Sequence, residues 1–296
     1  MKSEELETLI RANHILHYQE VLDAYGHVSL RHPDKPDVFI MSGDRAPALV
    51  SSPSDLIEYN ISDSSPVDPK SKRGYQERFI HSEIYKRYPN VNSVIHSHSD
   101  AVLPYTMNGV PMKPSFHIAG FLGTHVPVYD IIPLYQPGDQ QDMLVKTERL
   151  GSALASTFSS SSEQKEEHDH NVVLMSNHGF TVVGSSVKQA VYRAVYTRVN
   201  ASIQSQALIL RSAASFMSSA LSGSGTMPSS GPGSISGFGN SGLGGEGGGA
   251  GLGEMRFLDK KELSEGCMKM NDSSQDRPWA LWVREVEASP LYRIEK

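Results

Sequence analysis

A long stretch rich in glycine and serine interrupts this chain near its C-terminal end and limits what can fold around it. Residues 218–254 hold 14 of the chain's 25 glycines. This composition buries too little apolar surface to offset the conformational entropy lost on folding, so we expect the stretch to be disordered. Because loop-closure entropy grows slowly with length, a folded domain tolerates such an insertion. We therefore expect one main domain over residues 1–217 and a separate tail over residues 255–296.

The tail contains both tryptophans of the chain, Trp279 and Trp282. So short a segment is too small to bury an independent core. We expect it to pack on the main domain or on a neighbouring subunit.

The overall composition excludes several classes of protein. The chain has 27 Lys and Arg against 33 Asp and Glu, a net charge of -6, so it lacks the positive field that nucleic-acid binding requires. Cys267 is the single cysteine, which excludes an intramolecular disulfide and a cysteine-rich zinc module. No stretch approaches about 18 apolar residues, and the N-terminal residues are acidic where a secretory signal is basic and apolar. We expect a soluble, cytoplasmic protein that binds neither nucleic acid nor membrane.

Apolar spacing in the main domain changes repeatedly between the helical period and the strand period. Helices are predicted over residues 4–25, 77–88 and 187–210, and strands over 27–31, 37–41, 91–99 and 171–184, the last broken at 177–179. The run from Ser52 to Asp55 resembles a helix start. Because strands and helices alternate along the chain, the predicted class is α/β or a layered α/β/α arrangement.

Three of the twelve histidines stand at the ends of predicted strands. His96 and His98 terminate an apolar strand, and residues two apart in a strand point to the same face. His178 follows another apolar strand and precedes a glycine. Three imidazoles leave open coordination positions on a metal ion, which is typical of catalytic rather than structural sites. The His-x-His pair alone is a weak signal, and its position at the end of the strand adds weight.

Several motifs together resemble the class II aldolase/adducin-domain family over about residues 5–210. The motifs are GHVSLR at 26–31, Glu77-x-x-x-His81, VIHSHS at 94–99 and LMSNHGFTVVG at 174–184. The resemblance implies a three-layer α/β/α fold around a mainly antiparallel sheet.

The resemblance also implies a metal site and a catalytic acid. The family's metal ligands correspond to His96, His98 and His178, and its catalytic acid corresponds to Glu77, 19 residues before the first metal histidine. One divalent metal ion per subunit is implied; three imidazoles suit zinc, and also manganese, iron or cobalt. Relatives form homotetramers with active sites at the subunit interfaces, so a homotetramer is expected here.

The departures from the family pattern concern the substrate. Sugar-phosphate aldolases of this family hold phosphate with a Gly-Asn pair and with two serines just before the acid. Here Gly26-His27 and Tyr75-Gln76 stand at these places, so a phosphate-free substrate is expected. The tyrosine that protonates the leaving fragment in the aldolases corresponds to His117. Histidine also transfers protons near neutral pH, so His117, from the same or an adjacent subunit, is the second candidate catalytic residue.

Four further residues are candidate substrate contacts because they lie near the expected site. They are His27, Ser29, Ser42 and Gln76. Arg45 is either a partner for a substrate carboxylate, which a planar guanidinium matches, or part of a surface salt bridge.

The segments RAPALVSSPSDLIEY, YQERFIHSEIY and FHIAGFLG resemble a branch of the family that includes metal-dependent decarboxylases. The predicted function is a carbon–carbon lyase, either a decarboxylase or a retro-aldolase, in which a metal ion stabilises an enolate. The predicted substrate is a small hydroxy acid, keto acid or hydroxy-carbonyl compound. The alternatives are an iron-dependent oxygenase, a sugar-phosphate epimerase and a non-catalytic adducin-like module. The presence of all three histidines argues against the last alternative.

Overall fold

The computed structural model describes residues 3–161, 166–221 and 253–295. Met1–Gln204 and Phe257–Lys296 together form one compact unit, and Ser205–Arg256 form a second. Most of the stretch expected to be disordered lies outside the described residues, so that expectation stays a prediction.

One seven-stranded sheet forms the centre of the larger unit, in the order β3-β2-β1-β4-β7-β6-β5. All neighbouring strands are antiparallel except β5 and β6, which run parallel. The predicted mainly antiparallel sheet is confirmed. The strands are β1 (His27–Arg31), β2 (Val38–Ser42), β3 (Leu56–Asn60), β4 (Ser93–Ser97), β5 (Val128–Tyr129), β6 (Val172–Met175) and β7 (Gly179–Gly184).

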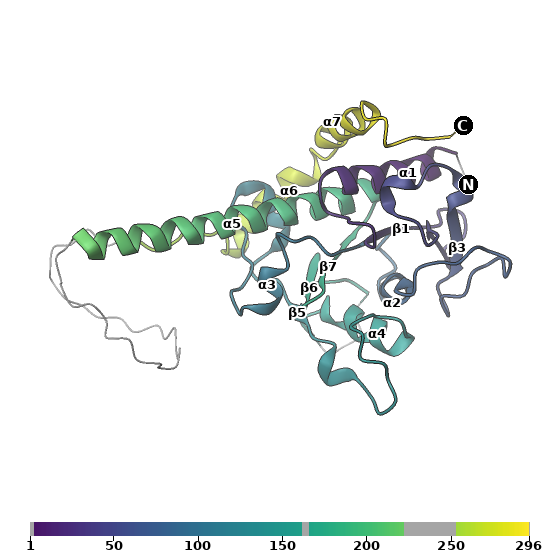
Figure 1. Ribbon diagram of the computed structural model, residues 1–296, viewed down its shortest axis with the longest axis horizontal. Coiled ribbons are helices and arrows are strands. Elements are labelled where there is room, and N and C mark those ends of the chain that lie inside the picture. The colour runs from purple at the N-terminus through teal and green to yellow at the C-terminus, as the bar shows by residue number, and fades with distance from the viewer. Residues whose placement is uncertain (1–2, 162–165, 222–252, 296) are drawn as a thin grey trace. The chain divides into compact units, whose positions relative to one another are not determined.

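Helices cover both faces of this sheet, and α1 and α7 lie on the side opposite to α2 and α4 (Figure 1). Successive side chains of a strand point to opposite faces of the sheet, so each strand contributes apolar residues to both faces. Ile40 joins the apolar cluster under α1, whereas Phe39 and Met41 join the cluster under α2 and α4. The α/β class with three layers is therefore confirmed. The helices are α1 (Ser3–Tyr18), α2 (Arg78–Arg87), α3 (Pro104–Met107), α4 (Glu148–Thr157), α5 (Val187–Leu221), α6 (Lys261–Asp272) and α7 (Asp276–Glu287).

Two predicted helix ends were wrong. The first helix ends at Tyr18 instead of residue 25, because the backbone turns at Glu20, whose φ is 56°. The last helix of the main domain continues to Leu221, past the predicted start of the glycine-rich stretch.

The segment after Pro53 is also different from the prediction. It makes only a 3-10 turn, Pro53–Asp55, before β3 begins. The Asp55 carboxylate accepts the backbone N–H groups of Ser51 and Ser52, as it would at a helix start. The next residues then pair with β2, which buries Ile57 and Tyr59 in the sheet.

Within the larger unit, the tail packs against α1. Trp279, Trp282 and Val286 of α7 are buried in the same apolar cluster as Leu9 and Leu16 of α1. Burial of each such side chain contributes about 1.5–3 kcal/mol relative to exposure. Among the described residues, no helix is long and apolar enough to cross a membrane.

Candidate metal centre

Antiparallel pairing of β4 with β7, two central strands of the sheet, brings the three predicted histidines together where β4 ends and β7 begins. His96 lies in β4, His98 follows it, and His178 lies in the turn between β6 and β7. Gly179 allows this turn to approach β4, because its φ is +148° and an added Cβ would lie 2.0 Å from the Ser97 carbonyl oxygen. No other residue type fits there without moving the two strands apart.

Four potential ligand atoms converge at these strand ends. His96 Nε2 lies 3.0 Å from His98 Nε2, and Glu77 Oε2 lies 3.7 Å from His96 Nε2 and 3.6 Å from His178 Nε2. One ligand atom from each of the four residues lies within 4.8 Å of the others. Two nitrogens that bind the same tetrahedral zinc ion are about 3.3 Å apart. The four residues therefore have the spacing of a metal site.

Hydrogen bonds on the outer side of two rings show which nitrogens are free to bind metal. His98 Nδ1 lies 3.4 Å from Asp23 Oδ2, and a carboxylate only accepts, so His98 carries its proton on Nδ1. His96 Nδ1 lies 3.4 Å from Thr181 Oγ1, and the Thr181 hydroxyl itself donates to Met175 Sδ. His96 therefore also carries its proton on Nδ1. Two lone pairs on Nε2 then face each other, an arrangement that a shared cation stabilises.

The surroundings of the site favour a neutral His96 imidazole, which can bind metal, and an ionised Asp23 carboxylate beside His98. Burial lowers the pKa of His96 well below its usual value, and the neighbouring imidazoles lower it further. The hydrogen bond from His98 lowers the pKa of Asp23, so this carboxylate stays ionised. Glu77 precedes α2 and is buried, and its Oε1 accepts the Val145 N–H at 2.9 Å, which directs Oε2 towards the histidines.

A cavity of about 570 Å³ opens onto this centre. Arg73 lies in its lining, three-quarters exposed, with Nε 3.2 Å from Asp44 Oδ2. The lining is formed by Tyr25, Asp44, Arg73, Gly74, Tyr75, Gln76, Glu77, His98, Leu103, Asp142, Met143, Leu144, Asn177 and His178.

Only one of the four predicted substrate contacts lies at the cavity. Gln76 lines the cavity, whereas His27, Ser29 and Ser42 are buried outside its lining. Ser29 instead hydrogen-bonds to His81 and to another side chain of α2, because β1 packs against that helix. Their role as substrate contacts therefore stays a prediction.

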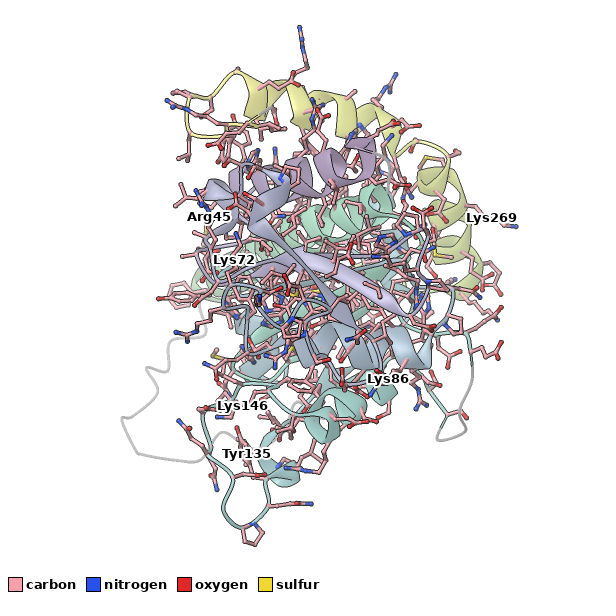
Figure 2. All side chains as sticks on the ribbon, turned by 90° about the vertical axis from the view of Figure 1, so that its right-hand side faces the viewer. Arg45, Lys72, Lys86, Tyr135, Lys146 and Lys269 are labelled. Atoms are coloured by element: carbon pink, nitrogen blue, oxygen red, sulfur yellow. The ribbon has the colours of Figure 1, made fainter. Side chains whose placement is uncertain are left out.

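Two further predicted residues also lie outside the lining. His117 is exposed at the start of the 3-10 helix His117–Leu122. Arg45 and Lys72 lie near each other (Figure 2) and both contact the Asp55 carboxylate, at 3.1 Å and 3.4 Å. Arg45 thus forms the salt bridge that was one of its two predicted roles.

Sequence reasoning did not identify Asp23 or Arg73. Asp23 lies four residues before β1 in a turn, and nothing local indicates that it meets His98 from β4. Arg73 is one of several basic residues in a polar loop, and only the fold shows that this one faces the cavity.

Comparison with known proteins decides the family. The pattern of the class II aldolase and adducin N-terminal domain matches residues 7–205. The chain belongs to this family. It is also 44% identical to the decarboxylase TropJ of Talaromyces stipitatus over 97% of this chain and 96% of that protein. It is 24% identical to a 3,4-dihydroxyphthalate decarboxylase of Arthrobacter keyseri over 64% of this chain and 73% of that protein.

Solved structures of class II aldolases share the fold. L-fuculose 1-phosphate aldolase of Glaciozyma antarctica superimposes with a TM-score of 0.62 at 17% identity, over 98% of this chain and 92% of that one. An aldolase II superfamily protein of Pseudomonas syringae gives 0.64 at 19% identity, over 98% and 96%. With decarboxylases among its family relatives, this class II aldolase family member is a lyase.

Proposed function

We propose that this class II aldolase family member is a divalent-metal-dependent decarboxylase of a small, phosphate-free hydroxy-aromatic acid. One observation carries the proposal: three imidazoles and a carboxylate converge beside a cavity in a chain that matches a decarboxylase along almost its whole length. The aromatic class is supported by the relative whose name gives 3,4-dihydroxyphthalate as its substrate.

His96, His98 and His178 would hold the ion, and Glu77 lies beside them. When bound, a divalent cation stabilises the negative charge that remains on the substrate as CO₂ leaves. Zinc is the proposed ion because it favours imidazole ligands, and manganese, iron and cobalt are the alternatives to test.

Glu77, in its protonated form, would deliver the proton that replaces the lost carboxyl group and would be left as the carboxylate. Loss of CO₂ leaves an electron pair on carbon, and a carbon–hydrogen bond must form there before the product is released. The Val145 N–H fixes one carboxyl oxygen, so the other oxygen faces both the histidines and the cavity. Because this oxygen lies between the histidines and the cavity, it is suited to pass a proton to a substrate carbon.

The packing around Glu77 favours a substrate without phosphate. The His27 and Tyr75 rings stand where the aldolases have phosphate-binding residues, and their centroids are only 4.8 Å apart. These two rings replace the compact hydrogen-bonding groups that hold phosphate in the aldolases. Arg73 at the cavity is the proposed partner of a substrate carboxylate, since its planar guanidinium matches that group.

The proposal includes a homotetramer in which His117 of a neighbouring subunit lies near the cavity. This part rests on the resemblance to the tetrameric aldolases. It is supported by the exposure of His117, which leaves its side chain available to another subunit.

The test is a screen of hydroxybenzoates and hydroxyphthalates under anaerobic conditions, with the chain loaded with zinc or manganese. We expect CO₂ and a product that has lost only the carboxyl group. A strict requirement for dioxygen would favour the oxygenase alternative, and an aldehyde product would favour retro-aldol cleavage. A product of unchanged mass would indicate an epimerase.

A further inference from the structure

A second group of polar side chains, buried behind the metal centre, forms a continuous line of hydrogen bonds. We call it the His27 chain: Tyr85, Ser29, His81 and His27. Tyr85 OH lies 2.7 Å from Ser29 Oγ, Ser29 Oγ lies 2.6 Å from His81 Nδ1, and His81 Nε2 lies 2.7 Å from His27 Nδ1. All four side chains are at most 2% exposed.

The hydrogen bonds of the His27 chain can all be donated from Tyr85 towards His27 or all in the opposite direction. One of these two directions leaves fewer buried protons without an acceptor. Within the described part of the molecule, Ser29 Oγ is the acceptor available to the Tyr85 hydroxyl. If the tyrosine donates, Ser29 donates to His81 Nδ1, and His81 Nε2–H then donates to His27 Nδ1. In the opposite direction the buried Tyr85 proton has no acceptor, which costs about 1–3 kcal/mol. The favoured direction makes His27 a neutral ring with its proton on Nε2.

This Nε2–H is the one end of the His27 chain that has no partner among the described residues. Its ring lies beside the metal centre: His27 pairs with His96 across β1 and β4, and their ring centroids are 5.2 Å apart. On its other side the His27 ring packs against Tyr75, which lines the cavity.

We propose that the His27 chain fixes His27 as an Nε2–H donor for the substrate oxygen that gains negative charge as CO₂ leaves. This inference rests on the proposed function. His27 would contact the substrate, and His81, Ser29 and Tyr85 would act as positioning residues. A donor fixed before the reaction requires no reorganisation when the charge develops.

Neutron diffraction from crystals of the full chain loaded with zinc tests the direction of the chain without any substrate. Deuterium on Nε2 of both His27 and His81 is the expected result. Deuterium on Nδ1 of His27 overturns the inference, because Nε2 would then be an acceptor or a further metal ligand.

A pair of tyrosine variants tests the remote end of the chain. Tyr85→Phe removes the donor that sets the direction, so kcat should fall about tenfold with little change in KM. Tyr88→Phe is the matched control, since its buried hydroxyl donates to the Ala155 carbonyl at 2.9 Å, outside the His27 chain. Equal kcat in the two variants contradicts the inference.

Variants of His27 test the donor itself. The amide nitrogen of glutamine reaches the position of Nε2, so His27→Gln should keep kcat within about tenfold, whereas His27→Leu should lose about 10²–10³-fold. Equal losses in both variants, in proteins that retain metal, contradict a donor role. If the neutron result is as expected but no acid loses CO₂, the proposed function fails while the direction of the chain stands.

Discussion

The metal centre and the His27 chain are neighbouring groups of four polar side chains that satisfy their hydrogen-bonding atoms in opposite ways. In the metal centre, lone pairs of His96 and His98 face each other at 3.0 Å. In the His27 chain, each donor meets an acceptor until the last N–H. The contrast teaches that burial alone does not distinguish a metal ligand from a positioning residue. The two are distinguished by whether the other hydrogen bonds of the ring leave it with a free lone pair or with a free N–H group.

The largest expected effect comes from removing a ligand. His178→Gln should lose stoichiometric metal and lower kcat by at least about a thousandfold, because the charge stabilisation by the ion is worth several kcal/mol. The exposed His125→Gln serves as the control. Metal analysis together with CO₂ release measures both effects. Full metal content and turnover in His178→Gln would remove this residue from the site.

Glu77→Gln separates the role of the acid from that of the ligands. We expect kcat to fall about 10²–10⁴-fold while metal content is kept, because the amide cannot deliver the proton. Glu83→Gln is the matched control: Glu83 is a buried carboxylate of α2, the helix that Glu77 immediately precedes, and it pairs with Lys86 at 2.7 Å. Loss of metal in Glu77→Gln would make Glu77 a ligand instead.

Asp23→Asn weakens the outer hydrogen bond of one ligand. Asp23 holds the Nδ1–H of His98, and loss of such a partner typically lowers metal affinity about 10–100-fold. A competition titration against a chelator measures the change. An unchanged affinity would show that Asp23 does not orient His98.

The last prediction concerns stability in acid, and it leaves metal binding and turnover aside. The pKa of His81 is about 3 in the folded chain and about 6.5 when unfolded, so on acidification the unfolded state takes up the proton first. The free energy of unfolding should therefore fall as pH drops from about 6.5 to 3, by up to about 1.4 kcal/mol per pH unit from His81. Denaturant titrations of His81→Gln should show a shallower dependence. Identical slopes in both proteins would contradict a neutral His81.

The sequence predicted which histidines converge better than it predicted which side chains line the cavity, for a physical reason. His96 and His98 are related by the local period of a strand, and His178 is marked by the glycine that follows it. The substrate contacts depend on which face of β1 meets α2, and this is decided by packing between distant segments. Ser29 was therefore predicted at the cavity and instead lies buried against His81.

In the fold too, local sequence patterns predicted some elements, whereas others depend on pairing between distant segments. The seven strands include each strand that strong apolar periodicity predicted, whereas β3 and the short β5 were not predicted. β3 was missed because Ser52–Asp55 has the pattern of a helix start. The local hydrogen bonds of Asp55 are those of such a start, but pairing with β2 makes the next five residues a strand. Likewise, the loop that carries Asp142 and Met143 to the cavity has no local pattern that indicates its destination.

The account rests on an ion held by His96, His98 and His178. CO₂ release by the chelator-treated chain, measured before and after one equivalent of divalent cation is restored, tests this most directly. We predict no release before addition and recovery of turnover after it. Undiminished CO₂ release from chain proven free of metal would contradict the account.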